Sequence, residues 1–317
     1  MNETVIDTGE AATTMSRRWA PGRPVSLMAT LGTLRRGSGD PTWRSTPGGF
    51  ATTWHTPGGC VAVRFTEHAR LGEIEVTGWG PGAEWVCDRL PQMLGADDDP
   101  TGFVPHHDLV AELWRRFPGW RVPSTGLVVA ALVPAVIEQL VTGAEAFAGY
   151  RYLVRKFGDP APGPFGLTTP PTPRRWMSIP SWEWARAGVD ATRASTVLRA
   201  VSYAGRLDEC AHLPLQTAHR RMRAIPGIGV WTAAEVAQRA LGDADAVSFG
   251  DYHVPADIGW ALTGSPVDDD GLAELLAPYA GHRFRVQRLL ELGGIHRPRR
   301  GPRMTIRTHT PSVARRR

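Results

Sequence analysis

The sequence predicts an α+β protein in which a small domain built on an antiparallel sheet precedes an all-helical domain. From about residue 25 to residue 78, short β-rich segments alternate with Gly, Pro and Asp clusters. After "GADDDP" at 95–100, apolar residues recur at helical spacing up to about residue 296. The 317 residues are also enough for about two domains, at roughly 150 residues each.

The expected N-terminal domain covers 25–100 and follows a polar, proline-bearing stretch, 1–24, that we expect to be a loose arm. "TPGG" at 56–59 is typical of a hairpin turn, and "GAEWVCDRLPQML" at 82–94 predicts the helix that closes the domain. Strands are expected in "SLMATLGTL", "GGFATTWHT", "CVAVRFTE" and "EIEVTGW", which are segments 26–34, 48–56, 60–67 and 73–79.

The expected helical domain covers 104–296, and its proline-rich stretch at 158–176 predicts a long surface loop. Helices are expected in eight segments, 106–117, 127–140, 143–158, 191–205, 214–225, 230–241, 272–280 and 283–294.

Composition excludes several classes of protein. The most apolar run, 127–137, contains Pro134 and is shorter than the roughly 18 residues of a membrane span, so no membrane partner is expected. The start, "MNETVIDTGE", is acidic and lacks the apolar core of a signal peptide, which predicts a cytoplasmic protein. Cys60, Cys87 and Cys210 form no CxxC pair, so neither structural zinc nor an iron–sulfur cluster is expected. We expect no metal and no cofactor.

The net charge of +5 arises at the end of the chain, because residues 297–317 hold eight arginines and no acidic residue, which leaves about −3 for residues 1–296. Such a tail is either a solvated end or a salt-sensitive attraction to a polyanion such as DNA. Lys156 is the single lysine among 36 basic residues, so a lysine nucleophile has one candidate.

The segment "IPGIGVWTA" at 225–233 has the features of a phosphate-binding turn. Pro226 presets the turn, whereas Gly227 and Gly229 permit positive φ and close approach of another chain. The helix that follows presents unpaired N–H groups at its positive end, where a phosphate can bind. An ordinary tight turn is the alternative, but a helix on each side favours a helix-hairpin-helix unit that grips duplex DNA, as enzymes and non-enzymatic DNA-binding proteins both do.

A carboxylate near the hairpin would supply chemistry. Asp251 in "FGDYH" follows Gly250 and precedes an expected helix, so it can cap that helix. A helix N-terminus also stabilises an ionised aspartate, which a site needs in order to face a developing positive charge. The spacing leaves the capping and catalytic roles open.

The hairpin and Asp251, which lies 22 residues after Gly229, together resemble the motif of the helix-hairpin-helix base-excision DNA glycosylase superfamily, with 3-methyladenine DNA glycosylase II as the nearest likeness. Residues 117–158 resemble that family's first core helices and include its Gln-Leu pair at Gln139 and Leu140. The resemblance covers roughly residues 25–295 and implies an enzyme that flips a damaged nucleotide out of double-stranded DNA and cuts its N-glycosidic bond. A monomer is expected, because one DNA contact per chain suffices.

The resemblance also assigns residues. It implies that Asp251 is catalytic and that Leu140 is the wedge that fills the gap in the base stack, with Gln139 beside it; a core leucine is the alternative for Leu140. It allows a monovalent cation on the carbonyl groups of the hairpin. The residues that it implies for the phosphate-binding hairpin are Pro226, Gly227, Ile228, Gly229 and Thr232.

Trp231 occupies the position where relatives that also cleave the DNA strand have a lysine nucleophile, so the resemblance implies a monofunctional enzyme that uses water. The indole can line the base pocket and attract a cationic alkylated base, or it can be a buried core ring. One carboxylate would suffice, because a 3- or 7-methylated purine leaves without protonation, whereas glycosidases acting on neutral leaving groups use two.

Other residues that the resemblance places at the base pocket depart from the family pattern. Glu235 replaces an aromatic residue and could bind an amino edge of a base or face solvent, and His282 replaces a tryptophan, with Tyr279 one turn earlier. Tyr252 completes this set. These departures leave open an enzyme of the same fold that acts on another damaged base, or a catalytically silent DNA-binding module.

Overall fold

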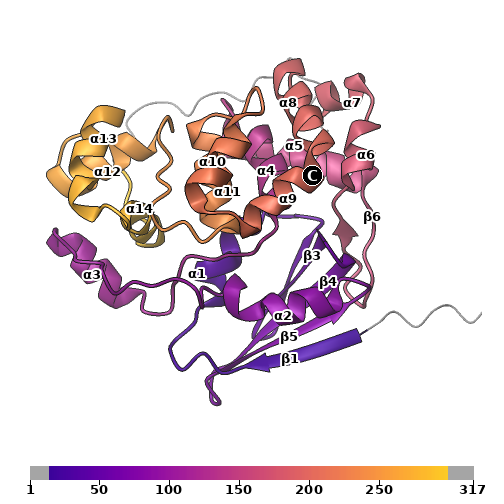
Figure 1. Cartoon of the computed structure of the whole chain (residues 1–317), viewed down its shortest axis with the longest axis horizontal. Coiled ribbons are helices and arrows are strands. Elements are labelled where there is room, and N and C mark those ends of the chain that lie inside the picture. Colours follow the sequence, from indigo (N-terminus) through magenta and orange to yellow (C-terminus); the bar gives the residue numbers. More distant parts are fainter. Residues whose placement is uncertain (1–13, 299–317) are drawn as a thin grey trace, which may run out of the picture.

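The structure, a computed structural model, describes residues 14–298 and confirms the α+β class (Figure 1). The strands are β1 (Thr14–Trp19), β2 (Trp43–Thr46), β3 (Gly49–Thr56), β4 (Gly59–His68), β5 (Glu73–Trp79), β6 (Asp159–Pro160) and β7 (Thr168–Thr169). The α-helices are α1 (Leu27–Leu31), α2 (Ala83–Met93), α3 (Asp108–Arg116), α4 (Val128–Ile137), α5 (Gly143–Phe157), α6 (Pro173–Met177), α7 (Ser181–Arg186), α8 (Ala191–Ser202), α9 (Ala204–Asp208), α10 (Leu215–Arg223), α11 (Val230–Ala240), α12 (Val254–Thr263), α13 (Asp269–Leu276) and α14 (Arg283–Leu292). Three short 3-10 helices, at Gly32–Leu34, Glu209–His212 and Ala277–Tyr279, complete them.

The first five strands form one antiparallel sheet in the order β1-β5-β4-β3-β2. Thr56 pairs with Gly59, which confirms the hairpin turn at 56–59 and the three strand segments from 48 to 79. Helix α2 packs on the sheet, and apolar side chains alternate toward it, so Val61, Val63 and Phe65 are fully buried.

The expected strand at 26–34 is wrong, because this segment forms helix α1 and a turn of 3-10 helix. The Ser26 side chain accepts a hydrogen bond from the backbone N–H of Ala29 and so caps the helix. Leu27, Thr30 and Leu31 are the buried residues, at a spacing that lies on one face of a helix. Capping and a three-and-four spacing therefore override the β-like composition.

The expected loose arm is wrong for residues 14–19, which form the edge strand β1 along β5. Ser16 donates a hydrogen bond to Thr77 on the neighbouring strand at 3.0 Å, and Arg17 pairs with Asp88 on α2. Residues 1–13 of the predicted arm lie outside the described residues, as do residues 299–317 of the predicted basic tail.

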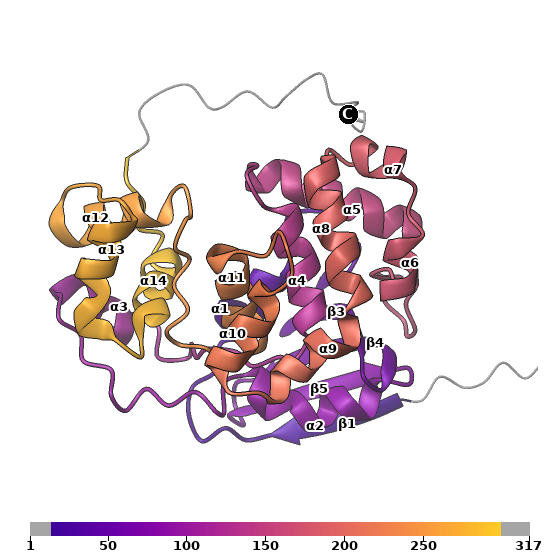
Figure 2. The ribbon, with the colours of Figure 1, turned by 45° about the horizontal axis from the view of Figure 1, so that its top comes forward.

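The helical part has two large hydrophobic cores and a small cluster around Ala234, Ala237 and Ala246. The larger core is formed by α4, α5, α8, α10, α11 and the segments between them. The smaller core joins α3 to α12, α13 and α14 at the other end of the molecule (Figure 2). The cores cross the predicted domain limits, because Leu127 packs with the sheet and Ala29 packs against the smaller helical core.

The proline-rich stretch at 158–176 is not a free surface loop. Its strands β6 and β7 pair with each other, and Thr53 on β3 donates a hydrogen bond to the carbonyl of Thr168 at 2.9 Å. The Trp79 and Phe165 rings meet edge to face at 5.2 Å. The stretch therefore connects the helical part to the sheet.

Within residues 14–298, none of the helices is long and apolar enough to span a membrane.

Candidate active site

The hairpin lies between α10 and α11, as the sequence predicts, and its two glycines have different roles. Gly227 has a φ of 94°, and a Cβ there would lie 2.3 Å from Oγ1 of Thr196 on α8. Gly229 has a φ of −92°, so it does not use the positive φ that a glycine permits. Ile228 is buried between them, and its N–H bonds to the carbonyl of Ile225 at 3.0 Å. The first glycine is thus required by the fold itself.

The second glycine faces open space. A Cβ built on Gly229 would have no protein atom within 4 Å. Gly229 begins α11 without a side-chain cap, so the first N–H groups of that helix have no capping partner. Val230, next to it, is 45% exposed. This end of α11 is therefore accessible to an anion and to a bulky ligand.

Gln139 is bonded to the hairpin from the end of α4. Its amide nitrogen donates to the carbonyl of Gly227 at 3.0 Å and to Oγ1 of buried Thr232 at 2.8 Å. Both N–H donors of the Gln139 amide are therefore used within the protein, and the Thr232 side chain is buried. Neither the amide N–H groups of Gln139 nor the hydroxyl of Thr232 is free for DNA. Arg199 on α8, which the sequence did not single out, donates to the carbonyl of Pro226.

Leu140 protrudes from the loop between α4 and α5. It is 103% exposed, which excludes the alternative of a core leucine. Its φ of 57° makes it the one non-glycine residue between 14 and 298 with a positive φ. A branched apolar side chain in this conformation is strained, and strain of this kind is concentrated at functional positions.

Asp251 lies at the start of α12 and contacts the hairpin helix. Its Oδ1 accepts the N–H groups of His253 and Val254 at 2.7 and 3.0 Å, so the carboxylate bonds the first N–H groups of α12 from two residues before the N-cap, His253. Its Oδ2 accepts the indole N–H of Trp231 at 3.1 Å. The carboxylate is thus fixed by three donors, and the Trp231 bond joins α11 to the segment that leads into α12.

The turn before Asp251 is held from α13. Gly250 has a φ of 83°, and its N–H donates to both carboxylate oxygens of Asp269 at 3.0 and 3.1 Å. Trp231 is half-buried, whereas Tyr252 is 89% exposed and lies edge to face against His253 at 4.9 Å. The Trp231 indole therefore contacts the carboxylate, whereas the Tyr252 ring is exposed beside His253, and the pocket role of both rings stays a prediction.

Glu235 neither faces solvent nor is free to bind a base. It is 8% exposed; one carboxylate oxygen accepts the Ser248 hydroxyl at 2.6 Å and the other pairs with Arg239 at 2.8 Å. The sequence missed Ser248, and the available signal was a set of polar residues, including Gln238 and Gln287, on the buried sides of apolar helices.

Tyr279 and His282 pack in the smaller helical core. Tyr279 is 2% exposed, and its hydroxyl bonds to the backbone N–H of His106 and to Nδ1 of His107. The His282 ring lies 5.7 Å from Phe103, and burial followed by repulsion from Arg285 lowers the pKa of His282. These contacts favour a structural role for both residues, in place of the expected walls of a base pocket.

Lys156 is on α5 and is engaged in an ion pair. Its ammonium lies 2.7 Å from the Glu183 carboxylate and 3.4 Å from the Tyr152 hydroxyl. The hydrogen bond to Glu183 raises the pKa of Lys156, so the amine is protonated at neutral pH. A protonated amine has no free electron pair with which to attack a sugar carbon.

The carbonyl groups of the hairpin are the candidate ligands for the monovalent cation that the family resemblance allows. Residues 14–298 contain no cluster of three or more His, Cys, Asp or Glu side chains that could hold a metal ion. The carbonyl oxygens of Pro226 and Gly227 accept side-chain donors from Arg199 and Gln139. Each retains a second lone pair, so the donor set still fits a monovalent cation, and this site stays a prediction.

No protein-family model matches the chain. A probable bifunctional transcriptional activator/DNA repair enzyme AlkA from Mycobacterium tuberculosis is 30% identical over 171 residues, which cover 51% of this chain and 34% of the relative. The chain thus spans about a third of the length of the curated relative that it matches.

Solved structures match over nearly the whole chain. A 3-methyladenine DNA glycosylase from Archaeoglobus fulgidus superposes with a TM-score of 0.71 at 19% identity, over 87% of this chain and 97% of that one. An 8-oxoguanine glycosylase/lyase from Clostridium acetobutylicum gives 0.65 at 11% identity, over 89% and 98%. The same enzyme in complex with double-stranded DNA gives 0.63 at 12% identity, over 86% and 93%. The chain has the fold of the helix-hairpin-helix DNA glycosylases, and its weak sequence similarity to AlkA supports the expected relationship to 3-methyladenine DNA glycosylase II.

Proposed function

We propose that this protein is a monofunctional DNA glycosylase of base excision repair that hydrolyses the N-glycosidic bond of alkylated purines in duplex DNA. The observation that carries the proposal is the bond from Trp231 to Asp251, at 3.1 Å. It places an oriented carboxylate beside the N-terminal end of α11, where the hairpin presents its free N–H groups. An anion-binding hairpin and a fixed anion side by side suit a substrate that is a phosphodiester and becomes a cation during the reaction.

Binding would begin at the hairpin. The open N-terminus of α11 binds a backbone phosphate of the duplex, and Gly229 lets the sugar-phosphate chain approach. Leu140, fully exposed on its strained loop, then fills the space that the flipped nucleotide leaves in the stack. Gln139 ties this loop to the hairpin, so phosphate and wedge contacts act at a fixed separation.

The chemistry would use one carboxylate. As the bond between the sugar C1′ and the base nitrogen breaks, its electron pair stays on the base and neutralises the charge of the alkylated purine. Positive charge develops on the sugar, and Asp251 stabilises it. A water oxygen then bonds to C1′, and Asp251 or solvent accepts the water proton. No general acid is needed for a base that leaves neutral.

The fold similarity to 8-oxoguanine glycosylase/lyases supports a second candidate, removal of an oxidised purine. Lyase chemistry would need an amine nucleophile near Asp251. Trp231 holds that position, and Lys156 on α5 is engaged with Glu183. The tryptophan at 231 and the ion pair of Lys156 thus favour the monofunctional proposal, whichever base is removed.

The test is base release from methylated duplex DNA by the wild type and by Asp251→Asn, with freed bases and DNA strands analysed separately. We expect the wild type to release 3-methyladenine or 7-methylguanine and to leave abasic sites in unbroken strands. Asp251→Asn keeps the shape of the side chain and removes its charge, so release should fall by about a hundredfold or more.

Other outcomes would revise the proposal. Release of 8-oxoguanine instead would favour the second candidate, and salt-dependent duplex binding without release of any base would indicate a silent DNA-binding module. We also propose a monomer, because one hairpin and one aspartate serve one lesion. A solution mass of twice the chain mass of 34.5 kDa would contradict this.

A further inference from the structure

Ser248, three residues before Asp251, is bonded through every polar group that it has. Its carbonyl accepts the N–H of Asp251 at 3.1 Å, and its own N–H donates to Oε1 of Gln287 at 3.1 Å. Its hydroxyl donates to Oε1 of Glu235 at 2.6 Å and accepts the side-chain amides of Gln238 and Gln287 at 2.9 and 3.0 Å. A hydroxyl that donates once and accepts twice has no capacity left.

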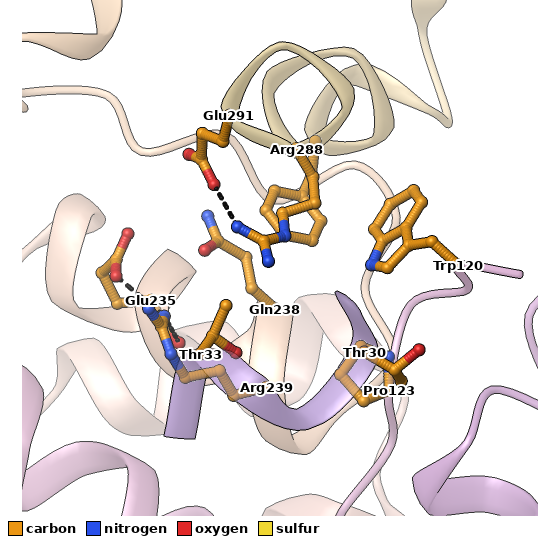
Figure 3. Close-up of a pocket in the computed structure, with 10 residues that line it drawn as sticks. Thr30, Thr33, Trp120, Pro123, Glu235, Gln238, Arg239, Arg288 and Glu291 are labelled. Atoms are coloured by element: carbon orange, nitrogen blue, oxygen red, sulfur yellow. Dashed lines mark hydrogen bonds and ion pairs between the residues drawn. The ribbon is translucent and has the colours of Figure 1, made fainter. Parts of the chain in front are cut away.

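The partners of Ser248 come from two helices that face each other. Figure 3 shows Glu235, Gln238 and Arg239 on α11 opposite Arg288 and Glu291 on α14, around a cavity of about 50 Å³. Ion pairs of 2.8 Å, from Arg239 to Glu235, and 2.9 Å, from Arg288 to Glu291, neutralise the two carboxylates. The segment that carries Ser248 runs between the two helices and is bonded from both sides.

Burial makes this network costly unless it is complete. Ser248, Gln238 and Gln287 are 1%, 4% and 3% exposed, and Glu235 is 8% exposed. Buried polar groups destabilise a core when they are unpaired, whereas apolar side chains of similar volume carry no such cost. A satisfied network, in return, fixes one arrangement of the chain. The Ser248 hydroxyl is satisfied in this way, whereas Nε of Arg239 at the edge of the network is buried without a hydrogen-bond partner. What it fixes here is the backbone that leads into Asp251.

We propose that Glu235, Gln238 and Gln287 are positioning residues, which act through Ser248 to hold the turn that presents Asp251. The inference rests on the proposed function and extends it, because it assigns a role to residues that do not touch the substrate. Holding a reacting group within about 1 Å can be worth about a hundredfold in rate. The Asp251 N–H is bonded to Ser248, so movement of Ser248 displaces the carboxylate.

The experiment compares four single variants of the full chain. Ser248→Ala removes the hydroxyl at the centre of the network. Glu235→Leu removes the acceptor, whereas Glu235→Gln keeps an acceptor oxygen and serves as the conservative rescue. Glu183→Gln is the matched control, because Glu183 is also a buried carboxylate paired with basic residues, but on α7.

Two quantities are measured for each variant, together with thermal unfolding and duplex affinity. The first is amide hydrogen exchange at Asp251, His253 and Val254, whose N–H groups are bonded in the turn. The second is the single-turnover rate of base release. Ser248→Ala and Glu235→Leu should raise exchange and lower the rate by about tenfold or more, with duplex affinity within about twofold of wild type. Glu235→Gln and Glu183→Gln should keep the exchange and the rate of the wild type. Glu235→Gln should lose thermal stability, because a glutamine has one acceptor oxygen and leaves Arg239 without its carboxylate partner.

Unchanged exchange in Ser248→Ala, or a slower rate without faster exchange, would overturn the inference. An equal rate loss in Glu183→Gln would overturn it too, because the effect would then be general destabilisation. If Ser248→Ala does not fold, Gln287→Met keeps the side-chain length and removes both bonds from Gln287 to Ser248, the one to its N–H and the one to its hydroxyl. Should the wild type release no base, the proposed function fails, and hydrogen exchange still decides whether the network holds the turn.

Discussion

The hairpin at 225–229 and the turn at 248–251 lie on opposite sides of the bond from Trp231 to Asp251, and they are built in opposite ways. The hairpin is largely exposed and is held by two side-chain donors, from Gln139 and Arg199. The turn is bonded from α11, α13 and α14, through carboxylate, amide and hydroxyl groups that are mostly buried.

The difference follows from what each part would do in a DNA glycosylase. A phosphate grip has to leave its N–H groups free for the ligand, so its own bonds are few. A carboxylate that faces a developing cation works best when its position is set before the substrate binds. Folding stability is therefore expected to withstand substitutions in the hairpin only where the hairpin faces DNA. In the turn, it should withstand only substitutions that preserve a polar partner.

The largest effect is expected for Gly227→Ala. A methyl group there would lie 2.3 Å from Oγ1 of Thr196, and the φ of 94° is unfavourable for alanine. We expect the free energy of unfolding to fall by about 2 to 4 kcal/mol and duplex binding to be lost. Chemical denaturation and binding to a fluorescent duplex measure the two effects.

Gly229→Ala is the control from the same hairpin. Its Cβ would meet no protein atom within 4 Å, and a φ of −92° suits alanine, so stability should stay within about 0.5 kcal/mol of wild type. Weaker duplex binding in this variant would locate the DNA at Gly229. Equal destabilisation of both variants would contradict the distinction between the two glycines.

The second prediction concerns Asp245, which anchors the segment before the turn. Its carboxylate accepts the N–H groups of Gly281 and Arg283 and the Arg283 guanidinium. Burial tends to raise the pKa of Asp245, but the bonds from Arg283 and Gly281 outweigh it, and the net pKa is lowered. Asp245→Asn should therefore lose about 2 kcal/mol of stability at pH 7.

The sign of the pH dependence follows from the lowered pKa. Asp245 binds its proton less readily in the folded than in the unfolded chain, so its contribution is complete above the unfolded pKa of about 3.9. It disappears as the pH falls through the folded pKa. The gap between the free energies of unfolding of wild type and Asp245→Asn should stay constant from pH 6 to 8 and close below about pH 4. A gap that widens in acid would refute this assignment.

How much of the fold and of the candidate site could be predicted from sequence depends on how far apart along the chain the contacting residues lie. The hairpin and the helices around it are local patterns, and the sequence places them correctly. Leu140 needed the structure, because its positive φ depends on how α4 ends beside the hairpin. The strand predicted at 26–34 failed for a local reason, since the Ser26 cap was overlooked.

The network around Ser248 could not be predicted from spacing. Glu235 and Gln287 meet at one hydroxyl, although they lie 13 residues before it and 39 residues after it. A pattern of single residues gives no sign of such a meeting, so the sequence assigned Glu235 to the base pocket or to solvent. Tyr279 was misjudged for a similar reason, because its partners His106 and His107 are more than 170 residues away.

A smaller effect, of opposite sign, is expected at Leu140. Leu140→Gly relieves the left-handed backbone strain at φ 57° but adds freedom to the unfolded chain, so the free energy of unfolding should rise by about 0.5 to 1 kcal/mol. Base release should fall nonetheless, because the wedge is gone. Leu140→Ala separates the two effects, since it removes the wedge without relieving the strain. A stability loss in Leu140→Gly would show that the exposed side chain packs in solution.

The smallest effect is expected at Lys156, and it tests the chemistry most directly. Lys156→Met removes the single lysine of the chain and leaves Glu183 paired with Arg186. Because the Lys156 side chain is 42% exposed and Arg186 still neutralises Glu183, stability should change little, and the rate of base release should stay within about twofold of wild type. Borohydride added during the reaction should trap no covalent DNA complex with either protein. A complex formed by the wild type and absent from Lys156→Met would mean that this amine reaches the sugar, and the assignment of water as the nucleophile would then be wrong.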